Sequence, residues 1–155
     1  MIVRASSAAV DVLQQATRRF TGLASGAAAF VRSPGTIAFI AVNGQEVQGW
    51  CWGYVLARPD GNSMLYLHNL EVLESCRGQG IGRGLLRSFM EAGAQLGARK
   101  MFLITGEDNL AARRLYESMG AGLATQGPTV NYWFSLPPNT SGPGNASPDK
   151  GSTCE

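Results

Sequence analysis

The sequence is poor in the residues that hold metal ions or close disulfide frameworks. Its 155 residues include one histidine and three cysteines, and the cysteines stand far apart at positions 51, 76 and 154. This spacing does not match that of metal ligands, and an odd number of cysteines argues against a disulfide framework. We therefore expect no metal cofactor and a reducing, cytoplasmic location.

Long apolar runs and concentrated charge are also absent. No apolar stretch approaches the roughly 18 residues of a membrane-spanning helix, and the first residues, MIVRASSAAV, lack a signal-peptide pattern. The formal net charge is only +2, and lysine and arginine form no run or stripe. We expect neither a membrane nor a nucleic acid as a partner.

Apolar residues, by contrast, are abundant enough for one core. A hydrophobic content of 45% over 155 residues suits a single domain. Residues 137–155, PPNTSGPGNASPDKGSTCE, contain no large apolar residue, so they cannot bury enough surface to offset the entropy of ordering. The sequence predicts a domain over residues 1–136 and a disordered tail over residues 137–155.

Periodicity predicts that strands and helices alternate within this domain, which indicates a mixed α/β fold. The Asn43-Gly44 pair predicts a hairpin turn, and residues 100–105 read as a buried strand. The expected strands are residues 1–5, 36–44, 45–57, 63–75, 100–105 and 129–136, and the expected helices are 7–20, 27–33, 80–97 and 109–120. The expected apolar helix positions are Ala9, Leu13, Ala16, Ile81, Leu85, Leu86, Phe89, Met90 and Leu96.

Four glycines stand at the start of the helix expected over residues 80–97. The stretch SCRGQGIGRGLL, residues 75–86, has glycine at positions 78, 80, 82 and 84. Ordered glycine costs entropy, so the cluster indicates that the backbone comes close to a ligand. A helix N-terminus favours an anion, usually phosphate. The dinucleotide fingerprint fails, because Arg83 and Leu85 stand where it needs glycine, and no Gly-Lys-Ser/Thr follows as in a P-loop.

The pattern Arg77-x-x-Gly80-x-Gly82 resembles the pyrophosphate loop of the GCN5-related N-acetyltransferases. Two further stretches resemble the same family in the same order. NLEV, residues 69–72, is similar to the strand that pairs with the pantetheine arm of acetyl-CoA, and TGEDNLAARRLYESMG, residues 105–120, to the segment that holds the cofactor. The resemblance covers about residues 2–136. It implies a single-domain acyl-CoA N-acyltransferase fold, a central, mostly antiparallel sheet flanked by helices, with acetyl-CoA as cosubstrate.

The resemblance also implies roles for individual residues. The cofactor-binding residues would be Leu70, Val72, Arg77, Gly78, Gln79, Gly80, Ile81, Gly82, Arg83, Asn109 and Ala112. Tyr116 would give a proton or hydrogen bond to the departing thiolate, and a backbone N–H near Leu70 would stabilise the oxyanion. Glu71 is the first candidate for the base, directly or through water, and Asn69 would orient the amine or a water. Read without these motifs, Tyr116 is a core tyrosine and Glu71 a structural carboxylate.

Within the family, the chain resembles the small aminoglycoside 3-N-acetyltransferases. The matching stretches are FVRSPGTIAFIAV (30–42), GYVL (53–56) and LYLHNLEV (65–72). This implies an aminoglycoside acceptor, hence antibiotic resistance, with Glu107 and Asp108 in the substrate pocket. Two features differ from that group: Asn69 replaces an aspartate, and RRFTGLASGAA (18–28) contains no acid. A protein N-terminus or lysine, a small-metabolite amine, a non-catalytic acyl-CoA-binding module and a homodimer all stay open.

Overall fold

The computed structural model describes residues 1–23, 26–125, 127, 132 and 134–136. Its helices and strands belong to a compact unit, Met1–Gly122. In the second unit, Leu123–Glu155, the described residues belong to no helix or strand. Of the strand expected over residues 129–136, residues 129–131 and 133 lie outside the described residues, and the tail expected over residues 137–155 lies entirely outside them.

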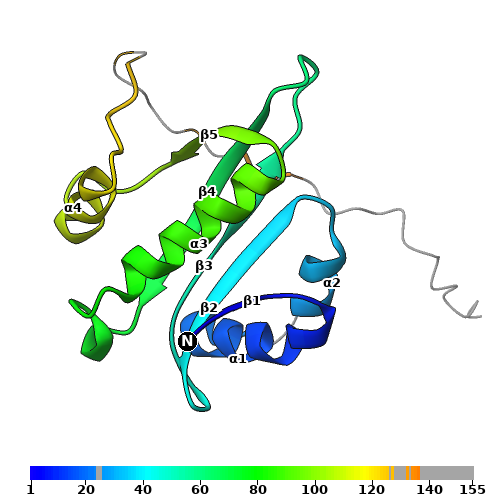
Figure 1. Ribbon diagram of the computed structural model, residues 1–155, viewed down its shortest axis with the longest axis vertical. Helices are drawn as coiled ribbons and strands as arrows, with labels where there is room; N and C mark the ends of the chain where they lie inside the picture. Colours follow the sequence, from blue (N-terminus) through cyan, green and yellow to red (C-terminus); the bar gives the residue numbers. More distant parts are fainter. Residues whose placement is uncertain (24–25, 126, 128–131, 133, 137–155) are drawn as a thin grey trace, which may run out of the picture. The chain divides into compact units, whose positions relative to one another are not determined.

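Five strands form one sheet whose spatial order follows the chain (Figure 1). They are β1 (Ile2–Arg4), β2 (Thr36–Asn43), β3 (Glu46–Leu56), β4 (Ser63–Val72) and β5 (Ala98–Leu103). The first four strands pair antiparallel, and β5 joins β4 in parallel. The predicted mixed α/β class and the mostly antiparallel sheet are confirmed.

The β2–β3 hairpin forms as predicted, but its turn lies one residue later. Asn43 is still in β2 and pairs with Glu46, so Gly44 and Gln45 form the loop. Gly44 has a φ of +58°, which glycine adopts without the steric cost that a side chain would add. The glycine therefore occupies the first loop position, and the asparagine ends the strand.

Helices cover both faces of the sheet (Figure 1). The helices are α1 (Val10–Thr21), α2 (Ala27–Arg32), α3 (Ile81–Gln95) and α4 (Leu110–Ser118). On one face, Leu13 and Ala16 of α1 pack against Ile40 and other residues of the sheet. On the other face, Leu85 and Phe89 of α3 form the second core. These two faces are called the α1–α2 side and the α3 side below.

Some expected core positions are wrong at the ends of elements. Met90 is 38% exposed on α3, and Leu96 is 49% exposed because it is already the C-terminal cap of that helix. Ala9 lies in a short 3₁₀ turn before α1. The expected buried strand, now β5, has exposed residues such as Lys100 and Phe102. Its only strand partner among the described residues is β4, so it lies at the edge of the sheet.

Candidate active site

The strands β4 and β5 pair along only part of their length. Their ladder ends at Leu67↔Leu103, whereas β4 continues to Val72. Within the described chain, β4 therefore has no strand neighbour on its β5 side from His68 onward. Unpaired backbone N–H and C=O groups need a hydrogen-bonding partner. This edge can accept an extended ligand in the way that an open sheet edge accepts an added strand.

A β-bulge at His68 marks the point where the strands separate. In the ladder with β3, Trp52 pairs with Asn69 and Gly53 pairs with Leu67, so His68 is an extra residue on β4. Bulges bend a strand and increase its local twist. The bend accounts for the end of β5 pairing at the same position.

The bulge also decides which side of the sheet each predicted residue faces. Side chains directly opposite each other in a ladder share a face. Asn69 lies opposite Trp52 and Glu71 lies opposite Trp50, and both tryptophans pack on the α1–α2 side. Leu70 packs against the core on the α3 side. The two predicted polar residues of β4 are therefore brought together on one face.

Asn69 and Glu71 form a direct hydrogen bond. The Asn69 Nδ2 group donates to Glu71 Oε1 at 2.7 Å. A carboxylate only accepts hydrogen bonds, so the amide nitrogen must face it and the amide oxygen must face elsewhere. The Asn69 Oδ1 atom is buried and has no protein partner. It is therefore an acceptor available to an N–H or O–H group of a ligand.

Two buried side-chain donors on the same face of the sheet also lack partners. Among the described residues, the buried side-chain N and O atoms that lack a hydrogen bond are Trp50 Nε1, Trp52 Nε1 and Asn69 Oδ1. They belong to two cross-strand pairs, Trp50↔Glu71 and Trp52↔Asn69. Leaving such a group unsatisfied costs about 1–3 kcal/mol, so their clustering indicates a place for ligand or water. The period-2 spacing of Trp50 and Trp52 in the sequence is the signal that both side chains share one face of β3.

Tyr116 lies on the opposite side of the sheet from this pair. It is half-buried on α4 and packs against the core on the α3 side. Burial, and then the nearby Cys51 thiol, raise the pKa of the Tyr116 phenol above its ordinary value. The phenol is therefore protonated at neutral pH and can donate a hydrogen bond. Burial also raises the pKa of Cys51 to about 12, so that thiol is not a nucleophile.

The glycine loop leads into the N-terminus of α3. Gly78 and Gly80 have φ values of +76° and +78°, and Gly80 is the N-cap residue, without a side-chain cap. A Cβ atom at either position would meet nothing within 4 Å. Glycine is required there by the backbone conformation, and the space beside both residues is open. These two positions fit the expected ligand cradle.

Gly82 and Gly84 have packing neighbours instead. A Cβ atom at Gly84 would lie 2.9 Å from Ile2 Cδ1, and one at Gly82 would lie 3.3 Å from Leu115 Cδ2. Small residues at these positions let α3 approach β1 and α4. The interpretation that all four glycines make room for a ligand is therefore wrong for Gly84, and packing against α4 gives Gly82 a second reason to be glycine besides the expected ligand cradle.

The first turn of α3 presents unused backbone donors. Its first intrahelical hydrogen bond runs from the Gly84 N–H group to Gly80 O, so the N–H groups before Gly84 have no acceptor within the helix. No acidic residue lies in that turn. An anion is favoured at such an end.

Arginine and glutamine side chains of the loop are engaged with the protein. Arg77 Nε donates to Val72 O at 3.3 Å, and Gln79 Nε2 donates to Ser75 O at 3.3 Å. Arg83 Nη2 donates to Ser118 Oγ of α4 at 2.9 Å. These bonds fix the loop between the end of β4 and α4.

The other predicted residues lie where α4 begins. Asn109 is the N-cap of α4, and its Oδ1 atom accepts a hydrogen bond from the Ala112 N–H group at 3.2 Å. Glu107 and Asp108 are exposed in the connection after β5. Because β4 and β5 are parallel, this connection follows the end of the sheet where the two strands separate. Nothing in the described structure links the two acids to Asn69 or Glu71.

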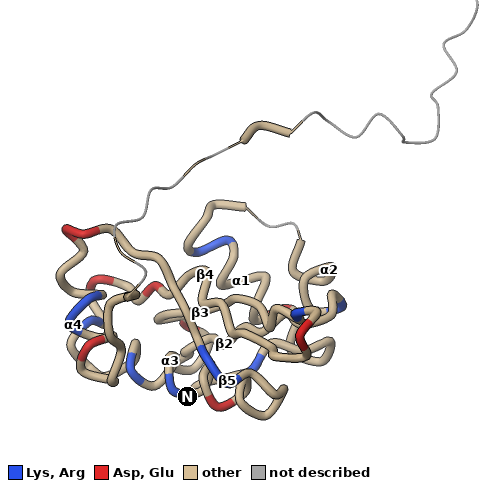
Figure 2. The backbone as a smooth tube through the Cα atoms, turned by 90° about the horizontal axis from the view of Figure 1, so that it is seen from above, with Lys and Arg blue, Asp and Glu red and all other residues tan. Residues whose placement is uncertain are grey.

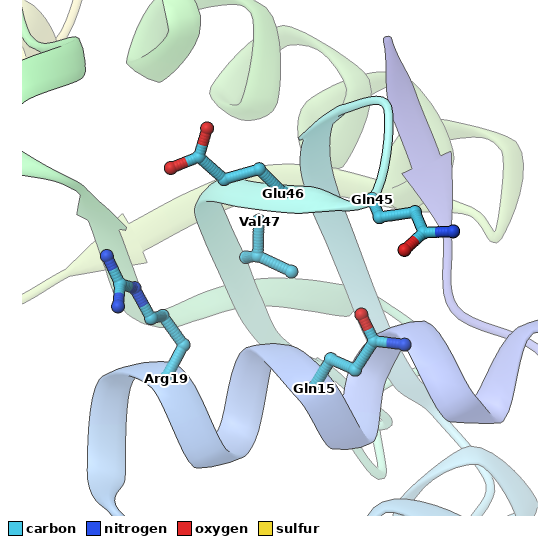
Figure 3. Close-up of a pocket in the computed structure, with 5 residues that line it drawn as sticks. All are labelled: Gln15, Arg19, Gln45, Glu46 and Val47. Atoms are coloured by element: carbon cyan, nitrogen blue, oxygen red, sulfur yellow. The ribbon is translucent and has the colours of Figure 1, made fainter.

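Surface hollows lie away from these residues. One of about 250 Å³ lies between α1 and the β2–β3 turn, and a second of about 290 Å³ lies near the start of β4 and β5. The first is lined by Gln15, Arg19, Gln45, Glu46 and Val47 (Figure 3), and the second by Arg58, Asn62, Ser63, Met64, Arg99 and Lys100. Neither hollow includes a predicted site residue. The predicted site residues of β4 lie instead along its unpaired edge.

Three further observations concern the described residues. Figure 2 shows basic and acidic residues interspersed over the helices, loops and β5. No group of three or more His, Cys, Asp or Glu residues in the described part could hold a metal ion. No helix in the same part of the chain is long and apolar enough to cross a membrane.

Comparison with protein families and curated proteins gives two matches. The model of the acetyltransferase (GNAT) family matches residues 9–121. The uncharacterized N-acetyltransferase YycN of Bacillus subtilis (strain 168) is 28% identical over 82 residues, which cover 52% of this chain and 51% of that protein. The match thus spans about half the length of that relative.

Solved structures of aminoglycoside acetyltransferases share the fold over 88% of this chain. The enzyme meta-AAC0020 from an uncultured soil metagenomic sample, in complex with sisomicin, has a TM-score of 0.73 at 16% identity, covering 88% of this chain and 95% of that chain. AAC(6′)-Iy in complex with CoA has a TM-score of 0.73 at 15% identity, with the same 88% and 95% coverage. At such low identity these similarities establish the fold.

Proposed function

The chain belongs to the acetyltransferase (GNAT) family, and we propose that it transfers the acetyl group of acetyl-CoA to a primary amine of an aminoglycoside. Family membership confirms the predicted enzyme class, N-acetyltransferase. The observation that carries the proposal is the separation of β4 from β5 beside the uncapped N-terminus of α3. One region thereby offers both an unpaired strand edge and an anion-binding helix end.

Acetyl-CoA matches these two features chemically. Its pantetheine arm is an extended chain with amide groups, which suit the β4 edge at Leu70 and Val72. Its pyrophosphate suits the free N–H groups of α3 and the open space beside Gly78 and Gly80. The residues proposed to hold it are therefore Leu70, Val72, Arg77, Gly78, Gln79, Gly80, Ile81, Gly82, Arg83, Asn109 and Ala112. When bound, acetyl-CoA supplies a reactive thioester.

The two faces of the sheet suit the two proton-handling roles. On the α1–α2 side, the Glu71 carboxylate would accept a proton from the incoming amine, directly or through water, and Asn69 holds that carboxylate by its 2.7 Å hydrogen bond. On the α3 side, the protonated Tyr116 phenol would donate to the sulfur. The Leu70 N–H group at the β4 edge would donate to the acetyl oxygen. Base and acid are thus proposed on opposite sides of one strand.

The aminoglycoside acceptor is supported by two separate similarities. The chain resembles the 3-N-acetyltransferases in its sequence, and the fold matches an aminoglycoside acetyltransferase crystallised with sisomicin. The sequence resemblance favours the 3-amino group as the acetylated position. Glu107 and Asp108 would attract the cationic substrate from the end of β5.

A thiol-release screen tests the proposal. The purified full chain is incubated with acetyl-CoA and gentamicin, sisomicin, a lysine peptide, a peptide with a free N-terminus or a simple alkylamine. We expect thiol release with the aminoglycosides, and NMR of the product locates the new amide. Release with a peptide or the alkylamine but with no aminoglycoside overturns the acceptor and leaves the family assignment intact.

A further inference from the structure

The second surface hollow lies at the opposite end of β4 from the candidate active site. It has a volume of about 290 Å³ and is lined by Arg58, Asn62, Ser63, Met64, Arg99 and Lys100. This cavity is called the basic hollow below. Strand residues rise about 3.3 Å each, so Ser63, the first residue of β4, lies roughly 20 Å along the strand from Leu70. The basic hollow is therefore separate from the strand edge proposed for acetyl-CoA.

The lining of the basic hollow is cationic. It contains two arginines and one lysine and no acidic residue. Arg58 is already paired, since its Nη2 group lies 2.8 Å from Asp60 Oδ2. The other oxygen of that carboxylate accepts the Asn62 N–H group at 3.0 Å, so Asp60 is engaged within its own turn. Arg99 and Lys100 are exposed and form no ion pair with any residue that the structure describes.

A supernumerary residue in β5 accounts for the position of both unpaired cations. In the ladder with β4, Ser63 pairs with Ala98 and Met64 pairs with Lys100, so Arg99 is the extra residue. Consecutive residues of a regular strand point to opposite faces, whereas a bulge changes the direction of a side chain. The irregularity allows Arg99 and Lys100 to line the same cavity.

Protection of the sheet edge is a second role that charged residues and bulges can have. Among the described strands, β5 is at the edge of the sheet, and Figure 2 shows basic residues on it. Edge protection requires neither a cavity nor a third cation from another element. Arg58 comes from the connection between β3 and β4, and it meets Arg99 and Lys100 at the basic hollow. This convergence favours a ligand.

The lining matches the chemistry of a small phosphate monoester. Such a group carries a charge of about −1.5 to −2 at pH 7, which suits the two cations without an ion pair. Arginine N–H groups and the lysine ammonium bind phosphate oxygens, and the Ser63 hydroxyl can donate as well. Met64 offers an apolar contact to a short organic part. Ligand pockets span roughly 300–1,000 Å³, so this volume suits a small compound better than a nucleotide.

We propose that the basic hollow is a second ligand site, which binds a small phosphate monoester through Arg58, Arg99 and Lys100. The site does not depend on the proposed acetyl transfer, and its ligand is neither the acetyl donor nor a cationic acceptor. Because the first residues of β4 and β5 both line the hollow, the bound ligand links these two strands at the end opposite their separation.

Amide chemical shifts test the location of the site. The nitrogen-15-labelled full chain is titrated with phenyl phosphate, inorganic phosphate or sodium chloride at matched ionic strength, with and without saturating CoA. We expect saturable shifts of the Ser63, Met64, Arg99 and Lys100 amides, with Kd for phenyl phosphate of about 1 mM. Inorganic phosphate should bind more weakly because it has no organic part. Since a helix N-terminus also attracts phosphate, residues 80–84 should respond too, and only their shifts should be suppressed by CoA.

Substitutions test the two unpaired cations. Arg99→Gln and Lys100→Gln should each raise Kd for phenyl phosphate about three- to tenfold. Lys100→Arg keeps the charge and should change Kd less than about twofold. Arg19→Gln is the control for net charge, because it removes one cation from the other hollow and should leave Kd unchanged. Circular dichroism, thermal melts and light scattering verify that each variant is folded and does not aggregate.

Each outcome supports the site or overturns it. Saturable shifts at the basic hollow that weaken in both glutamine variants support it. Shifts confined to residues 80–84, shifts that sodium chloride reproduces, or an equal loss of affinity in Arg19→Gln overturn it. Aggregation of the glutamine variants with unchanged Kd would assign Arg99 and Lys100 to edge protection instead. The proposed function is tested separately, because thiol release with an aminoglycoside requires neither of these residues.

Discussion

Asn69 donates a hydrogen bond of 2.7 Å to Glu71 from two residues earlier on the same face of β4. The neutral amide of Asn69 orients the Glu71 carboxylate. Glu71 is therefore the only acidic side chain of this pair. Aspartate at position 69 would place two like charges there, and each would disfavour ionisation of the other.

Asn69→Asp should therefore move the acid limb of the pH–kcat profile to higher pH. Asn69→Leu, which removes the hydrogen bond without adding charge, should lower kcat about tenfold and move that limb in the same direction by a smaller amount, because the carboxylate loses a donor that favours its ionised form. Steady-state kinetics between pH 6 and 9 make the comparison. Identical limb positions in wild type and the aspartate variant would mean that Glu71 does not titrate in catalysis.

Glu71→Gln should remove the base while preserving the size of the side chain. The loss of rate should be greatest below neutral pH, because there the uncharged amine is scarce and assistance in its deprotonation matters most. The measurement is kcat/KM against pH for a good acceptor, with acetyl-CoA affinity by calorimetry as a control. An unaltered pH profile would exclude Glu71 as the base.

Tyr116→Phe should lower kcat roughly ten- to a thousandfold and leave the affinity for acetyl-CoA nearly unchanged. Because burial raises the pKa of the Tyr116 phenol, the phenol loses its proton only above pH 10.0, the ordinary pKa of tyrosine. Wild-type activity should therefore show no loss from ionisation of this group below pH 10.0. A variant with wild-type kcat would return Tyr116 to a packing role.

Cys51 should make the stability of the fold sensitive to alkali. Its pKa is raised by burial from 9.0 to about 12, so the unfolded chain loses this proton at lower pH than the folded chain. The resulting stabilisation is complete below pH 9.0 and is lost as pH rises towards 12.

Urea unfolding of wild type and Cys51→Ala at several pH values tests this sign. The variant is less stable at neutral pH because it leaves a small cavity, and the difference in unfolding free energy should shrink above pH 9.0. A difference that stays constant up to pH 11 would mean that the thiol ionises equally in both states.

Gly80 and Gly84 should separate ligand binding from packing. Gly80→Val forces a branched side chain into a left-handed conformation, at a cost of about 1–3 kcal/mol, and fills the open space proposed for the pyrophosphate, so acetyl-CoA affinity should fall at least about tenfold. Gly84→Val crowds Ile2, 2.9 Å from the new Cβ atom, and should lower Tm without changing the affinity. Calorimetry and thermal melts on both variants provide the measurements. The same affinity in both would contradict the assigned roles.

Patterns within a short stretch of sequence were sufficient for most of the elements. The Asn-Gly pair located a hairpin and the apolar spacing of α3 located a helix, because these signals depend on local backbone preference. The exposure of β5 could not be predicted in this way, since its apolar run KMFLIT is the same whether a neighbouring strand covers it or not.

The site was predicted through its motifs, and its geometry was not. Simple alternation would place Asn69 and Glu71 on the same face as Leu67, in the α3 core, and the extra residue at His68 reverses that assignment. A bulge depends on the pairing of two strands, so one strand's sequence does not reveal it. The close packing of Gly82 and Gly84 could not be predicted either, because their neighbours belong to α4 and β1, which are distant in the sequence.

The bulge at His68 also has a meaning for how such a site can arise or disappear. Because it consists of one supernumerary residue in β4, deleting that residue would leave Asn69 and Glu71 on their present face but would straighten the strand and allow its ladder with β5 to continue. The open edge would then close while every proposed catalytic side chain remained. Substitutions can change the side chains of this site. Gain or loss of a single in-frame codon, by contrast, determines whether β4 has an unpaired edge there.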